Sequence, residues 1–223
     1  MQRLTYLLLL LFVSTLAFAQ SDVDVTAEEQ PMTLTDVDDN LIPFVESFEP
    51  SNVGFLHVYV DPAADPLETY LFRGVEMGPA SIALLPAEYR QMAEEDGATM
   101  YGAITIMGIE ENLYLTRLRG DTRDQIDMFA ARNGEVVHLK TLAFLNCDEP
   151  GNCGQLDSYI TDLNLDTTFD LVQIERENGQ DEEGDRSVYT MLRDTRTWVE
   201  TDELDVPWEG ITFYKHDSAS RDH

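Results

Sequence analysis

Oxygen-bearing side chains recur at alternate positions of one short stretch of the chain. Asp162, Asn164, Asp166 and Asp170 stand at its positions 1, 3, 5 and 9, and the backbone carbonyl near Thr168 can join them. In a tight turn this spacing aims several oxygens at one point, and Ca²⁺ takes roughly six to eight oxygen ligands. The sequence therefore predicts a calcium site formed by these residues.

The surrounding segment, YITDLNLDTTFDLVQI from Tyr159 to Ile174, resembles the calcium loops of FG-GAP/VCBS-type repeat proteins. The pattern of that family runs approximately D-x-N-G-D-G-x-x-D-L, and Leu165 and Thr167 stand where it has glycine. Glycine eases backbone with φ above zero, so the resemblance implies a bend at both places. It also implies calcium as the ligand and a propeller-blade-like repeat. The alternative is an acidic turn, without metal, in an acidic protein.

An earlier stretch repeats this pattern. Residues 114–122 align with residues 159–167 through the shared sequence Y-[LI]-T-x-L-x-x-D-T. Arg117 and Arg119 occupy the places of the first two oxygen ligands. A guanidinium group binds carboxylates through paired hydrogen bonds, so the first copy is predicted to use an internal cation where the second uses metal.

The charge of the chain limits its partners. It has 14 basic and 43 acidic residues, which give a formal net charge of −29. Such a field repels nucleic acid, and beyond the leader no apolar run is long enough for a membrane span. The acidic charge indicates either a solvated surface suited to salty surroundings or a surface that attracts divalent cations or basic partners. The ligand is expected to be an unidentified protein or carbohydrate. A hydrophobic content of 43% argues against general disorder.

The first residues have the features of a signal peptide. Arg3 precedes an apolar run from Tyr6 to Leu16, and Ala17-Phe18-Ala19 fits the small-x-small pattern before a cleavage site. Residues 1–19 are therefore predicted to be removed during export, which places the mature protein in the periplasm or outside the cell.

The rest of the chain is predicted to form one mainly β domain. Residues 20–50 are acidic and rich in turn-forming residues, as in a flexible leader, and residues 216–223 form a polar tail. Residues 51–215 contain the domain, with the repeats at about 112–145 and 157–200. Alternating apolar residues there indicate antiparallel sheets with propeller-blade-like repeats.

One helix is expected near residues 85–95. Pro86 suits a first turn, the apolar residues that follow approximate a helical stripe, and Gly97 ends it. Two further segments, residues 70–77 and 211–214, are expected to be strands.

No motif for enzymatic chemistry stands out. The sequence contains no G-x-S-x-G elbow, P-loop, H-E-x-x-H or Rossmann glycine pattern. The favoured function is therefore a non-catalytic binding or structural module that calcium stabilises. The alternative from a different class is a secreted hydrolase that uses paired carboxylates.

Cys147 and Cys153 are predicted to form a disulfide. They are the two cysteines of the chain, and Pro150, Gly151 and Asn152 form a turn between them. Exported proteins meet oxidising conditions, in which a cysteine pair this close most simply forms a disulfide.

We expect thiol titration of the denatured protein to detect no free thiol before reduction and both thiols after it. Because the closed loop is short, reduction should lower the free energy of unfolding by only about 2 kcal/mol. Two free thiols in protein recovered from an oxidising compartment would contradict the prediction.

Overall fold

The computed structural model describes residues 38–52, 54–61, 69–108, 111–121, 123–149, 152–177 and 184–215. All of these residues belong to one compact unit. The expected signal peptide, the first part of the expected leader and the C-terminal tail lie outside the described residues.

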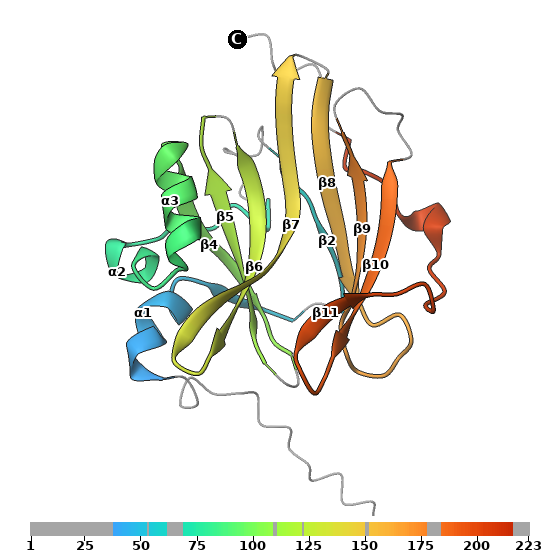
Figure 1. Cartoon of the computed structure of the whole chain (residues 1–223), viewed down its shortest axis with the longest axis horizontal. Coiled ribbons are helices and arrows are strands. Elements are labelled where there is room, and N and C mark those ends of the chain that lie inside the picture. Colours follow the sequence, from blue (N-terminus) through green and yellow to red (C-terminus); the bar gives the residue numbers. More distant parts are fainter. Residues whose placement is uncertain are drawn as a thin grey trace, which may run out of the picture. The chain divides into compact units, whose positions relative to one another are not determined.

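Strands dominate the described chain, which confirms the expectation of a mainly β fold with antiparallel sheets. They form one sheet in the order β1-β4-β5-β6-β7-β8-β9-β10-β11, with β3 added to β4 and β2 added to β8 (Figure 1). Apart from the parallel pair β1–β4, the recorded pairs are antiparallel. The strands are β1 (Glu49–Ser51), β2 (Phe55–Val58), β3 (Val75–Glu76), β4 (Thr99–Ile106), β5 (Leu113–Arg119), β6 (Asp124–Arg132), β7 (Glu135–Glu149), β8 (Asn152–Thr161), β9 (Asp170–Arg176), β10 (Asp185–Leu192) and β11 (Thr197–Glu200).

The expected helix near residues 85–95 is present as α3 (Ala87–Glu95). Pro86 precedes its first turn, and Gly97 adopts a φ of +58° just beyond its end. None of the helices in the described residues is both long and apolar enough to cross a membrane. The other helical segments are short: η2 (Asp39–Leu41), α1 (Ile42–Val45), α2 (Pro79–Ile82) and η3 (Trp208–Gly210).

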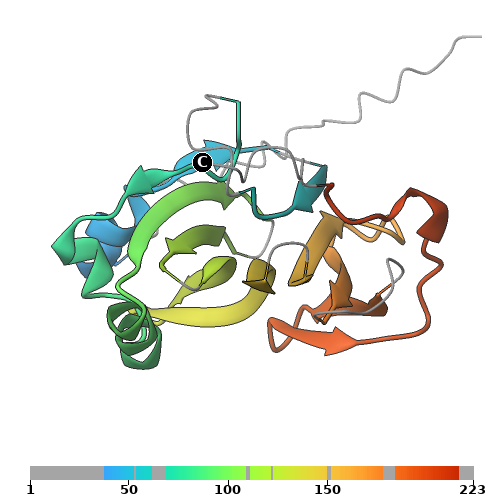
Figure 2. The ribbon, with the colours of Figure 1, turned by 90° about the horizontal axis from the view of Figure 1, so that it is seen from above.

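The two faces of the sheet bury different clusters of side chains. On β5, Leu113 and Leu115 face an interior cluster shared with β2, β4, β6, β7 and β9, whereas Tyr114 and Leu118 face α1, α2 and α3. This is the period of two that a strand imposes on its side chains. Figure 2 shows that the sheet is strongly curled.

Strand β8 joins the two parts of the sheet because it has two partners along one edge. Its first half pairs with the end of β7, from Phe144 opposite Leu156, and its second half pairs with β2, from Phe55 opposite Thr161. Its other edge pairs with β9 from Gln155 opposite Arg176 to Thr161 opposite Asp170. Strand β2 thus pairs with residues about a hundred positions away in sequence.

The folded part of the chain begins earlier than the sequence indicated. Residues 39–51, assigned above mostly to the flexible leader, form η2, α1 and β1, and Phe44 is fully buried. The segment packs tightly, because a Cβ atom at Gly102 of β4 would lie 2.1 Å from the carbonyl oxygen of Ser47. The segment was predicted to be flexible because its few buried apolar residues lie within acidic sequence.

Two expected strands are shorter than predicted or absent. Residues 70–77 contribute only β3, and residues 211–214 are not in a strand. The second segment is fixed mainly by hydrogen bonds to side chains instead of a strand partner, since Tyr159 and Asp157 bind its backbone.

We expect Phe44→Ala to lower the free energy of unfolding by about 3 to 5 kcal/mol, as for other fully buried phenylalanines. Its ring contacts those of Phe48 and Tyr114 at centroid distances of 4.9 and 5.2 Å. Phe55→Ala is the matched control. Because Phe55 is 57% exposed, this substitution should lower the free energy of unfolding by less than about 1 kcal/mol. Equal losses in urea unfolding would contradict the packing of the 39–51 segment.

Candidate functional site

The residues predicted to bind calcium lie in the loop that connects β8 to β9. Asn164 and Asp166 are exposed, Asp162 is half-buried, and Thr168 and Asp170 are buried. The structure therefore brings the predicted ligands into one loop, with its carboxylates spread from the solvent to the protein interior.

Hydrogen bonds within the loop hold its polar side chains inward. The amide N–H of Asp166 donates to Asp162 Oδ1 and to Asn164 Oδ1, at 3.0 Å in each case. Asp162 Oδ2 accepts from the amide of Thr167 at 2.8 Å, and Asp166 Oδ1 accepts from that of Thr168 at 2.8 Å. Each carboxylate oxygen keeps a second lone pair for another partner.

The backbone bends where the calcium-loop pattern has glycine. Leu165 and Thr167 have φ angles of +59° and +69°, in the left-handed region that glycine adopts without steric cost. Side chains with a Cβ atom pay about 1 to 2 kcal/mol there, and Thr167 is also β-branched. The bends agree with the conformation that the missing glycines implied.

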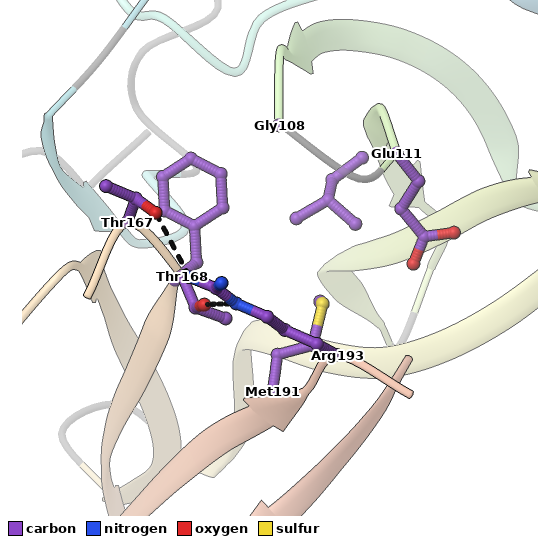
Figure 3. A pocket seen from close by; sticks show the side chains of 8 residues that line it. Gly108, Glu111, Thr167, Thr168, Met191 and Arg193 are labelled. Atoms are coloured by element: carbon purple, nitrogen blue, oxygen red, sulfur yellow. Dashed lines mark hydrogen bonds between the residues drawn. The ribbon is translucent and has the colours of Figure 1, made fainter. Parts of the chain in front are cut away.

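Arg193, next to the end of β10, supports the loop from one side (Figure 3). Its Nε donates to Thr168 Oγ1 at 2.8 Å, and its Nη2 donates to Thr167 Oγ1 at 3.1 Å and to the carbonyl oxygen of Asp166. A cavity of about 30 Å³, lined in part by Phe169 and Glu111, lies beside these contacts. It has room for about one or two water molecules.

Asp170 differs from the other fully buried aspartates of the described chain, Asp127 and Asp157. Its Oδ2 accepts from the amide of Leu163 at 2.9 Å. The Thr190 hydroxyl lies near enough to lower the pKa of the carboxyl, but no hydrogen bond to Oδ1 is recorded among the described residues. A buried, unpaired carboxylate oxygen costs free energy unless a donor or a cation reaches it. Asp170 thus offers an unused ligand at the base of the loop.

The electrostatic surroundings of Asp170 and Asp166 are opposite. Burial raises the pKa of Asp170, and the nearby charges of Asp166 and Asp162 raise it further against the lowering by the Leu163 amide and the Thr190 hydroxyl. The pKa of Asp166 is lowered, chiefly because the amide of Thr168 stabilises its charged form. A divalent cation in the loop would relieve the penalty on Asp170.

The other two buried aspartates have full sets of donors that the sequence analysis missed. Asp127 accepts from Gln125 at 2.6 Å, Thr141 at 2.7 Å and Tyr89 at 3.0 Å, and His138 Nε2 lies 3.1 Å away. Burial and the contact with Asp127 raise the pKa of Tyr89, which keeps its proton as a donor.

Asp157 is held in a related way. Gln155 donates to it at 2.9 Å, His57 Nε2 lies 2.9 Å away, and the amide of Tyr214 donates at 2.6 Å. These contacts join β8, β2 and the C-terminal segment at one buried charge.

A short sequence pattern underlies both arrangements. Gln125-Ile-Asp127-Met-Phe129 and Gln155-Leu-Asp157-Ser-Tyr159 share Gln-x-Asp-x-aromatic. In each case the aromatic residue lies directly opposite the histidine of the neighbouring strand, Phe129 opposite His138 and Tyr159 opposite His57. The sequence contains the pattern, but it does not indicate which histidine lies beside each aspartate.

The repeat proposed from residues 114–122 and 159–167 falls on strand pairs of matching register. Thr116 lies opposite Asp127, and Thr161 lies opposite Asp170. The connections differ, because the first pair continues to Arg119 opposite Asp124, whereas the second stops at Thr161 and opens into the loop. Common origin of the two copies stays a prediction.

The first copy contains an internal cation. The buried guanidinium of Arg117 donates to both carboxylate oxygens of Asp124, at 2.9 and 2.7 Å. The arginine therefore binds an aspartate outside the pairs that the sequence alignment matched. Arg119 lies at the end of β5.

Cys147 and Cys153 lie directly opposite one another on β7 and β8. This register suits a cross-strand disulfide, which stays a prediction.

The fit of calcium to the loop rests on oxygens of several chemical types. Within the described ranges, no three His, Cys, Asp or Glu side chains cluster as a metal site. The loop set instead mixes the carboxylates of Asp162, Asp166 and Asp170 with the amide of Asn164 and the backbone near Thr168, as calcium loops do. The three aspartates do not themselves form such a cluster, so a cation would depend on the amide and backbone oxygens as well. Among the described residues, Asp170 Oδ1 is the buried oxygen of the loop for which no hydrogen bond is recorded.

Comparisons with protein-family models, curated proteins and solved structures find no match to this chain.

We expect Asp170→Asn and Asp166→Asn to have opposite pH dependence in chelator. The folded-state pKa of Asp170 is raised above 3.8, so its stabilising contribution is complete below that value and is lost as the pH rises through the raised pKa. Asp170→Asn should therefore gain stability relative to the wild type as the pH rises.

Asp166 has a folded-state pKa below 3.8, so its contribution is present above that value and is lost as the pH falls. Asp166→Asn should therefore lose stability relative to the wild type at neutral pH. Urea unfolding between about pH 3 and pH 7 measures both differences. Parallel profiles for the two variants would contradict the assignment of these environments.

Proposed function

We propose that the chain is an exported, non-catalytic binding or structural module whose 162–170 loop binds calcium. The observation that carries the proposal is the fully buried Asp170, whose Oδ1 has no hydrogen-bond partner among the described residues. A cation at this point would convert an electrostatic penalty into a stabilising contact.

The remaining ligands support the same proposal. Asp162, Asn164 and Asp166 converge on the backbone of one turn, and the bends at Leu165 and Thr167 hold that turn in a left-handed conformation. With a backbone carbonyl near Thr168, the loop offers oxygens of the types that Ca²⁺ prefers. Calcium would supply positive charge there and fix the loop.

The electrostatics favour binding over the hydrolase alternative. A cleft beside the loop is lined by two carboxylates, those of Asp166 and Glu203. A hydrolase with paired carboxylates needs one that stays protonated as the general acid, and this requires a raised pKa. The pKa of Asp166 is lowered instead, and Asp170, whose pKa is raised, is fully buried and does not line the cleft.

We expect calcium to raise the melting temperature of the protein relative to chelator. Extracellular calcium sites commonly have dissociation constants of about 10⁻⁴ to 10⁻³ M. A hundredfold excess over the dissociation constant would add about 2.7 kcal/mol, or about 5 to 10 °C in melting temperature. Calorimetry or circular dichroism measures the shift.

The double variant Asp162→Ala with Asp166→Ala should lose this shift. The control with the same change in charge is Glu88→Ala with Glu94→Ala, on the exposed side of α3. It should keep the shift, because it alters only the general attraction of an acidic surface for cations. An unchanged melting temperature in calcium, or a shift that survives the loop variant, would refute the proposal.

A further inference from the structure

A cleft of about 340 Å³ lies beside the calcium loop. Its walls come from the 162–170 loop, the end of β10 and the segment that follows β11. This volume is at the lower end of the range of small-molecule sites.

Arg193 provides a fixed hydrogen-bond donor at the cleft. Its Nε and Nη2 are held by Thr168, Thr167 and the carbonyl oxygen of Asp166, so the plane of the guanidinium is set by the protein. The hydrogen bonds recorded for Arg193 within the described part of the chain use Nε and Nη2, and none uses Nη1. A donor oriented in advance loses little entropy when a ligand accepts from it.

The other lining groups accept hydrogen bonds or provide small apolar areas. Glu203 contributes a carboxylate, Thr190 and Thr201 contribute hydroxyls, and Met191 and Leu204 contribute apolar side chains. Thr190 lies directly opposite Asp170 on the neighbouring strand, so the cleft and the buried carboxylate share one face of the sheet.

We propose that this cleft binds a neutral carbohydrate. Sugar hydroxyls both donate and accept, which matches Arg193 on one side and Glu203 and the threonines on the other. An anionic ligand would be repelled by Asp166, Glu203 and the net charge of −29, whereas a neutral ligand is not repelled by any of them. No aromatic side chain is among the lining residues, so hydrogen bonds would carry the recognition.

This inference rests on the proposed function for its dependence on calcium. Asn164, Asp166 and Thr168 line the cleft and belong to the predicted calcium loop. Calcium that fixes the loop would therefore also fix one wall of the cleft and the groups that hold Arg193.

Calorimetric titration of the full chain with cellotetraose, laminaritetraose and mannotetraose tests the inference, in calcium and in chelator. We expect at least one of these neutral sugars to bind in calcium with a dissociation constant in the millimolar range, and more weakly in chelator. Arg193→Lys and Glu203→Gln should each weaken binding roughly tenfold, because each loses a hydrogen bond to a charged group. Asp202→Asn, an exposed neighbour that does not line the cleft, should bind as the wild type does.

The outcomes separate the two proposals. If calcium raises the melting temperature but none of the sugars binds at millimolar concentration, the carbohydrate site is refuted and the calcium loop stands. If a sugar binds and both variants weaken it while calcium has no effect, the cleft is supported and the calcium proposal fails. Binding that neither variant weakens would place the sugar elsewhere and overturn the inference, and the melting temperature of each variant would show whether it had folded.

Discussion

Buried carboxylates need hydrogen-bond donors or cations beside them, and this need determines which segments of the protein pack together. A charged group taken out of water is costly unless donors or cations surround it, and three aspartates of the described chain are fully buried. Asp157 meets this need by binding β2, β8 and the backbone of the C-terminal segment at once. Asp127 meets it through α3, β6 and β7. Their positions therefore fix which segments come together.

Asp170 has an incomplete set of hydrogen-bond partners among the described residues. The other two carboxylates accept hydrogen bonds on both oxygens, whereas in the described chain no hydrogen bond is recorded to Oδ1 of Asp170, beneath an exposed acidic loop. In a protein with a net charge of −29, further protein cations are scarce, and Arg193 is already committed to the loop backbone and the threonine hydroxyls. An external cation is then the simplest way to complete the set.

Local patterns predicted the sheet well because alternation of side chains is a property of short segments. The helix α3 and the bends at Leu165 and Thr167 could likewise be predicted from neighbouring residues. The segment around Phe44 was misjudged because its few apolar anchors lie within acidic sequence. The histidine partners of the buried aspartates escaped prediction because His57 and Asp157 are 100 positions apart and meet only through strand pairing.

The pairing of β8 with β2 limits the order in which strands can pair while the chain is synthesised from its N-terminus. Strand β2 appears early, yet its recorded partner begins only at Asn152, after seven tenths of the residues have been made. Helix α1 and β1 must similarly await β4 and β5. Such distant pairings slow folding, because the entropy of loop closure is lost before the stabilising contacts form. Strand β2 therefore stays without its recorded strand partner until residues 158–161 have been made, whereas β4 to β7 can pair in the order of their synthesis.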